Sequence, residues 1–369
     1  MKPTTAAPAA RWFPLVERPR PAAMSLATRV ADLRHLLEPA SDDALVRTAE
    51  ALNKAALIAS DRGQSDLARF LCWQQYQAFD YTRPHPRAIA KLALQPVLNL
   101  PRQLIRDGDA DAAYALLEVL HHAASNRADI TIDGHVVHLH DLTHSAGDHH
   151  DLRATVWAAL LADGTRALTT AGRWREAADR AAVHRGIGQR LLDGRQITIL
   201  ALLREGDVDQ ASALVETSTV SAPWECAIQA MLRVMCQRVG AGSQKNVATM
   251  VTSVRHLLEQ TTRGGTVFRV RAGLIALELA DDPHDDQIQR LLTAVLQAAA
   301  DDAYASRDAL TVPALQVHIP VAARRKLVRA VRAADLIPGE LPAPLRTEFM
   351  ANVASALRTL RRILGSGAK

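Results

Sequence analysis

Aromatic residues and cysteine are both scarce in this sequence. Aromatics make up 4% of the 369 residues, whereas alanine and leucine are abundant, and both residues favour helices that pack closely on one another. The cysteines, Cys72, Cys226 and Cys236, are odd in number and none lies in a CxxC pair. This spacing argues against a disulfide framework and against a zinc ribbon, and we expect a protein of the reducing cytoplasm.

Long apolar runs are absent as well. No stretch approaches the roughly eighteen consecutive apolar residues that a membrane-spanning helix needs, so we expect no association with membranes. The N-terminus also lacks the apolar core of a secretory signal. Residues 1–24 carry prolines, alanines and scattered arginines in its place, and we predict a disordered Pro/Ala-rich tail there.

Recognisable catalytic motifs are missing too. No serine lies in a nucleophile-elbow motif, and no two carboxylates have the spacing expected of a general acid and a general base. Gly186-Ile187-Gly188 lacks the preceding strand and the third glycine of a dinucleotide-binding loop. Cys72 has apolar neighbours and no adjacent cationic or histidine residue, which predicts a core residue and not a nucleophile. The sequence therefore leaves open whether the protein is an enzyme.

What the chain does contain is an internal repeat. A glycine is followed five residues later by an alanine at four junctions between amphipathic stretches: Gly63 and Ala68, Gly108 and Ala113, Gly172 and Ala177, Gly206 and Ala211. Glycine permits the tight turn that ends one helix, and alanine lets the next helix approach closely. Gly172 and Gly206 lie 34 residues apart, which is the tetratricopeptide period, and Trp174 supplies an aromatic two positions after the first glycine.

Over about residues 40–260 these features resemble the tetratricopeptide repeat (TPR) family, although its hallmark tyrosine, phenylalanine and closing proline are mostly missing. The Ala- and Arg-rich composition is similar to that of actinobacterial members. The resemblance implies an all-α fold, a TPR-like α-solenoid of antiparallel helix pairs with a long groove that binds a peptide or protein.

One segment breaks the helical pattern. Two short β-branched stretches flank Asp133-Gly134, a dipeptide favoured in two-residue turns, so we expect an inserted β-hairpin near residues 130–140. We place the solenoid over 25–305 and a basic helical C-terminal cap over 306–369. Base-stacking aromatics are not interleaved with the basic residues of this cap, so we do not expect it to bind nucleic acid.

The hairpin and the segment after it are rich in histidine. His138 and His140 lie two residues apart, so on a strand they point to one face, which is how many histidine metal sites begin. His144, His149 and His150 are candidates for the third ligand, and we take His144 first. The alternative is that a solvent-facing turn simply collects histidines. We expect no cofactor, and a zinc ion is the alternative.

A second polar concentration follows the repeat at Gly172. It comprises His184, Arg185, Arg190, Asp193, Arg195 and Gln196. A groove lined with arginines can hold carboxylates or a peptide backbone by bidentate hydrogen bonds, whereas the alternative is ordinary charge on a helix surface. We treat these six residues as the candidate partner-binding set.

The main functional hypothesis is a peptide- or protein-binding scaffold, in the setting of a specialised-metabolite pathway such as antibiotic biosynthesis. The alternative is an enzyme, or an enzyme subunit, that matures a ribosomally synthesised peptide, for example a thioether-forming cyclase of lanthipeptide type. Its partners would be the precursor peptide and the other modifying enzymes. Its chemistry would have to come from the histidine cluster or from His184 as a general base.

Overall fold

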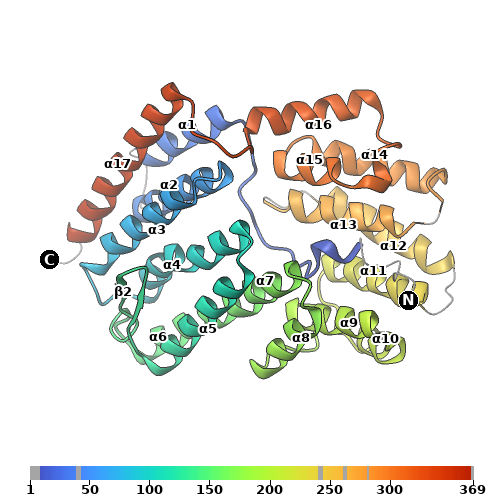
Figure 1. Cartoon of the computed structure of the whole chain (residues 1–369), viewed down its shortest axis with the longest axis horizontal. Coiled ribbons are helices and arrows are strands. Elements are labelled where there is room, and N and C mark those ends of the chain that lie inside the picture. The colour runs from blue at the N-terminus through green and yellow to red at the C-terminus, as the bar shows by residue number, and fades with distance from the viewer. Residues whose placement is uncertain (1–8, 39–42, 240–243, 261–263, 281, 367–369) are drawn as a thin grey trace. The chain divides into compact units, whose positions relative to one another are not determined.

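The chain is an all-α protein with one small β-hairpin, and this confirms the predicted fold class (Figure 1). The computed structural model describes residues 9–38, 43–239, 244–260, 264–280 and 282–366. No helix within these ranges is both long enough and apolar enough to cross a membrane.

The chain forms two compact units and passes from one to the other three times. Unit 1 consists of residues 1–24 and 168–334, and unit 2 consists of residues 25–167 and 335–369. Each unit is therefore assembled from two segments that are distant in sequence. The N-terminal segment belongs to unit 1, whereas the C-terminal segment belongs to unit 2.

The predicted boundaries differ from these units. The solenoid predicted over 25–305 is shared between both units, and the cap predicted over 306–369 is divided at residue 334. Of the disordered tail predicted over 1–24, the first eight residues lie outside the described part of the chain, but Phe13 and Leu15 are 3% and 4% exposed. Removing these apolar side chains from water stabilises an ordered segment in spite of its prolines.

Unit 2 contains the first helices of the chain, the hairpin and the C-terminal helix. Its elements are α1 Leu26–Leu37, α2 Ala44–Asp61, α3 Ser65–Asp80, α4 Arg87–Asp107, α5 Ala110–Asn126, β1 Ile130–Ile132, β2 His135–Val137, α6 Ala146–Ala159, the π-helical turn η2 Leu160–Gly164, the start of α7 Thr165–Thr170, and α17 Ala343–Ser366. Consecutive helices pack on one another, and α2 also contacts α4 while α4 contacts α6. Contacts of a helix with the next and, at α2 and α4, with the next but one are the pattern of stacked helix pairs.

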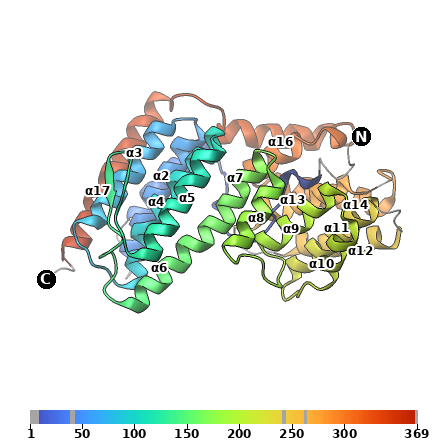
Figure 2. The same cartoon turned by 60° about the horizontal axis from the view of Figure 1, so that its bottom comes forward.

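The C-terminal helix α17 packs on α1, α2 and α3, and Figure 2 shows it running alongside them. Asn352 of α17 donates to the backbone oxygen of Val30, 3.1 Å away. Arg62, at the end of α2, donates to the backbone oxygens of Asp335 and Glu340 at 3.0 and 2.7 Å. The helix therefore covers the first helices of unit 2.

Unit 1 repeats the same packing scheme. Its elements are η1 Ala9–Trp12, the end of α7, α8 Trp174–Val183, α9 Asp193–Glu205, α10 Val208–Glu216, α11 Pro223–Val239, α12 Gln244–Glu259, α13 Thr266–Glu278, α14 Asp286–Ala299, α15 Ala303–Leu310, η3 Pro313–Leu315 and α16 Val321–Ala334. Here α11 contacts α12 and α13, α12 contacts α14, and α13 contacts α15. Helix-repeat packing is thus present within each unit by itself.

The repeated glycines and alanines do what their spacing predicts. All four glycines adopt a left-handed backbone, with φ between 66° and 86°, and each ends a helix or the turn after it. All four alanines are 0% exposed, on the helix that follows. After two of the glycines, Asp109 and Asp207 accept from the backbone N–H three residues on and so cap α5 and α10.

The hairpin near residues 130–140 is confirmed. β1 and β2 are antiparallel, with Ile130 opposite Val137, and Asp133 and Gly134 both have positive φ, as a two-residue turn of this kind requires. Trp73 of α3 stacks on His135 with ring centroids 4.5 Å apart. The hairpin is therefore held against α3.

Candidate functional site

The side-chain contacts of four of the six predicted partner-binding residues fall into two groups. Arg190 binds Glu225 in the first turn of α11 and Arg195 binds the segment before α11, whereas Asp193 and Gln196 bind the N-terminal segment. The other two residues, His184 and Arg185, end α8, and the backbone N–H of His184 donates to Arg180 at 3.1 Å.

Arg195 is a structural side chain in this arrangement. It is 7% exposed and donates to four groups, namely Ser218 Oγ, Gly188 O, Leu214 O and Thr217 Oγ1, at distances between 2.7 and 3.0 Å. Burial lowers its pKa. Four of the five N–H donors of its guanidinium are engaged in this way, so Arg195 fastens the loop before α9 to the end of α10.

Arg190 is likewise engaged. It forms a bidentate ion pair with Glu225, at 3.0 and 3.1 Å. Glu225 is 0% exposed and also accepts from the backbone and hydroxyl of Ser221. Burial raises the pKa of Glu225, but the hydrogen bonds from Arg190 and Ser221 outweigh burial and hold the pKa below its usual value. The pair fixes the start of α11.

Gln196 binds the extended N-terminal segment, residues 13–24, which we call the strap. The side chain of Gln196 is 0% exposed. Leu15 N–H donates to Gln196 Oε1 at 2.7 Å, and Gln196 Nε2 donates to Leu15 O at 3.0 Å and to Leu191 O at 2.6 Å. One buried amide therefore satisfies both backbone groups of a strap residue, as a neighbouring β-strand would.

The arginines of the strap are recognised next. Both carboxylate oxygens of Asp193 accept from Arg18, and the Nη1 contact measures 3.0 Å. Arg20 places its guanidinium over the ring of Tyr304, 3.8 Å from the centroid, and its backbone N–H donates to Gly264 O at 3.0 Å. Two arginines that lie two positions apart are thus bound, one by the carboxylate of Asp193 and the other by the aromatic face of Tyr304.

The end of the strap is bound at the start of α15. Ala23 N–H donates to Asp302 Oδ2 at 3.2 Å, and Ala23 O accepts from the backbone of Ala303 at 3.0 Å. Earlier in the strap, between Leu15 and Arg18, Glu17 has a buried oxygen, Oε1, with no hydrogen-bond partner among the described residues, and its charge interacts with that of Arg269. The strap is therefore seated along α9, α13 and α15 by backbone groups and by charge.

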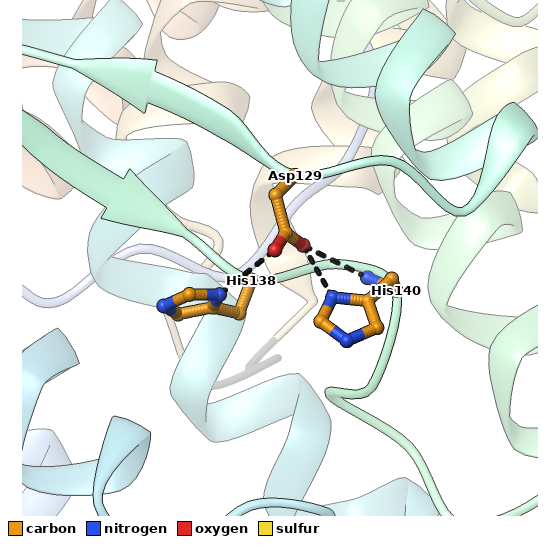
Figure 3. Close-up of side chains that lie close together, drawn as sticks. All are labelled: Asp129, His138 and His140. Atoms are coloured by element: carbon orange, nitrogen blue, oxygen red, sulfur yellow. Dashed lines mark hydrogen bonds and ion pairs between the residues drawn. The ribbon is translucent and has the colours of Figure 1, made fainter.

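A second candidate site lies at the open end of the hairpin (Figure 3). Asp129 precedes β1, and His138 and His140 follow β2. Asp129 Oδ2 lies 2.9 Å from His138 Nδ1, and Asp129 Oδ1 lies 2.7 Å from His140 Nδ1. Burial raises the pKa of Asp129, but the hydrogen bonds from His140 and His138 outweigh it and lower the pKa to about 2. We call these three residues the His–Asp cluster.

The structure joins His138 and His140 with Asp129 and places His144 elsewhere. His144 N–H donates to the backbone of His85, 3.1 Å away, at a short bridge that tethers the segment to the start of α4. Sequence reasoning missed Asp129, although a signal was present. Since Ile130 pairs with Val137, the residue before Ile130 must lie opposite His138.

Comparison of the chain with protein-family models, with curated proteins and with solved structures finds no match. The strap and the His–Asp cluster are the two groups of contacts in the described residues that point to a function. The strap is the larger of the two, because it contacts residues of α9, α13 and α15.

Proposed function

We propose that the protein is a peptide- or protein-binding helical-repeat scaffold, and that unit 1 holds an extended partner segment along the line of the strap. The observation that carries this proposal is the pairing of Gln196 with both backbone groups of Leu15. A buried side chain that hydrogen-bonds to the peptide backbone can bind an extended residue whatever its side chain. Such main-chain hydrogen bonds supply affinity in peptide recognition.

The contacts of the strap also define which segment fits. Leu15 enters a buried position, Asp193 binds an arginine three residues later, and Tyr304 faces a second arginine five residues later. The partner class is accordingly an extended peptide with the spacing apolar-x-x-Arg-x-Arg. In this proposal the strap of the same chain occupies the binding site. Because the strap is tethered, its effective concentration at the site is about millimolar, and a peptide from outside has to compete with it.

The test separates the strap from the chain after the protein has folded. A protease site inserted between Met24 and Ser25 is cleaved, and the free segment is exchanged for a fluorescent peptide of residues 9–24. We expect saturable binding with one peptide per protein. Gln196→Leu should weaken it at least about 10-fold, because each buried backbone group left unpaired costs about 1–3 kcal/mol.

Two peptide variants act as a matched pair. Arg18→Ala removes the partner of Asp193 and should weaken binding about 5-fold, a modest loss because Arg18 is 43% exposed in its ion pair. Pro21→Ala changes an exposed strap residue and should bind within about twofold of the parent peptide. Failure of the peptide to bind a cleaved protein that keeps its helical circular dichroism would refute the proposal. Unrelated peptides with the same Arg spacing, tested on the emptied site, then extend it to outside partners.

The repeat type and the setting belong to the same proposal. The 34-residue step between Gly172 and Gly206, both left-handed at helix ends, supports the TPR assignment. Three free cysteines support a cytoplasmic location, and the Ala- and Arg-rich composition supports an actinobacterial, specialised-metabolite setting.

A further inference from the structure

The His–Asp cluster brings three metal-ligating side chains to one point. Among the described residues it is the one group of three His, Cys, Asp or Glu side chains whose ligand atoms all lie within 4.8 Å of one another. Donor atoms bound to one zinc ion at about 2.0–2.2 Å lie about 3.4 Å apart in a tetrahedral site. The observed spacings, 2.9 and 2.7 Å from Asp129 to the two imidazoles, need only a small expansion to take an ion.

The backbone around the cluster is already fixed. His138 N–H donates to the hydroxyl of Tyr76, 2.9 Å away, and Tyr76 is 1% exposed on α3. His140 N–H donates to Asp129 Oδ1 at 3.3 Å. Hairpin pairing sets the remaining positions, because Asp129 and His138 extend the Ile130 to Val137 register by one residue. The ligands therefore start from an ordered frame, which reduces the entropy lost on binding.

An outer carboxylate supports one of the imidazoles. Asp141 Oδ2 lies 3.5 Å from His140 Nε2, the nitrogen that points away from Asp129. Arg83 holds Asp141 in place by a 2.9 Å hydrogen bond. A carboxylate on the far nitrogen of a ligating histidine orients the ring and strengthens it as a ligand.

We propose that Asp129, His138 and His140 bind one zinc ion through a carboxylate oxygen and two Nδ1 atoms. This donor set of two imidazoles and one carboxylate suits zinc, and three protein ligands leave a position for water or for an outside ligand. The ion would replace the hydrogens that now link the carboxylate to the two rings, and it would fasten the segment after β2 to the start of β1. This proposal does not depend on the binding of a peptide by unit 1.

The test is calorimetric titration of untagged, chelator-stripped protein with Zn²⁺. We expect one ion per chain with a dissociation constant below about 10 µM, and Asp129→Asn, His138→Ala and His140→Ala should each weaken binding at least about 30-fold. His144→Ala is the matched control, because this histidine is close in sequence but is not one of the three residues whose ligand atoms come together; the variant should bind zinc within about twofold of the parent.

A second readout keeps the result independent of folding. Co²⁺ in place of Zn²⁺ should give visible absorption bands of a four- or five-coordinate site in the parent protein and in His144→Ala, and none in the three cluster variants. Circular dichroism verifies that the variants are folded. Zinc binding that is equally weak in all five proteins, or that depends on His144 and not on Asp129, would overturn the assignment.

Discussion

Gly194 lies in the first turn of α9, between the two residues that hold the strap, Asp193 and Gln196. A Cβ atom at this position would lie 2.4 Å from the backbone oxygen of Gly186 and 2.9 Å from its carbonyl carbon. Ordinary contact begins at 3.4 Å, so one of the two backbones would have to move by about 1 Å. Gly186 itself is fixed, because its N–H donates to Ala181 O at 2.7 Å.

The expected cost follows from two opposing terms. Overpacking a well-packed interior destabilises by about 1–3 kcal/mol, and the upper end applies here because the obstacle is backbone and not a flexible side chain. Alanine is a better helix former than glycine by about 1 kcal/mol, which offsets part of this loss. We therefore expect Gly194→Ala to lower the free energy of unfolding by about 2 kcal/mol.

Gly188→Ala is the matched control in the same loop. Its Cβ would meet nothing within 4 Å, and Gly188 does not have a positive φ. The change should be neutral or should stabilise by up to about 1 kcal/mol, through the unfolded state. Urea denaturation followed by circular dichroism measures both variants. A Gly194→Ala protein as stable as the parent would show that α9 and Gly186 are not in close contact, and the seating of the strap would need a different explanation.

Three further predictions test other parts of the chain. Gly273→Ala would place a Cβ 2.3 Å from Val295 Cγ2, so we expect the free energy of unfolding to fall by about 1–3 kcal/mol. Adding Val295→Ala in the same chain should restore part of this stability, and additive losses in a double-mutant cycle measured by urea denaturation would contradict the prediction. Burial lowers the pKa of His149, so as the pH drops the unfolded chain takes up the proton of this histidine before the folded chain does, and the free energy of unfolding should fall between pH 7.5 and 5.5. The stability of His149→Gln should fall less over this range, and an equal fall would count against the burial of His149 as the cause. Exposed Cys226 should react with a thiol reagent at pH 8 well before Cys72, whose pKa burial raises to about 12; the reverse order would place Cys72 at the surface.

Much of the fold could be predicted because its signals are local. A glycine that ends a helix and an alanine five residues later act within one turn, and all four pairs take the expected roles. The hairpin was equally accessible, since Asp133-Gly134 specifies its turn without help from the rest of the chain. Even Asp129 could have been paired with His138 by counting back from that turn.

The partners of the polar residues were not accessible in this way. Gln196 and Leu15 are 181 positions apart, and Arg18 and Asp193 are 175 apart. From the sequence, residues 1–24 are rich in proline and alanine, and nothing local marks Phe13 and Leu15 as buried. Arg190 and Arg195 look like a binding surface for the same reason, because their partners, Glu225 and the end of α10, lie beyond the local window.

The sequence by itself therefore determined the all-α class, the helix ends and the inserted hairpin, which depend on the conformational preferences of neighbouring residues. Only the tertiary structure decided which segments share a core and that α17 covers the first helices of unit 2. It also decided that the N-terminal strap packs against α9, α13 and α15. These choices depend on burial and on hydrogen bonds between distant residues, and their free energy is gained only when the chain has brought those residues together.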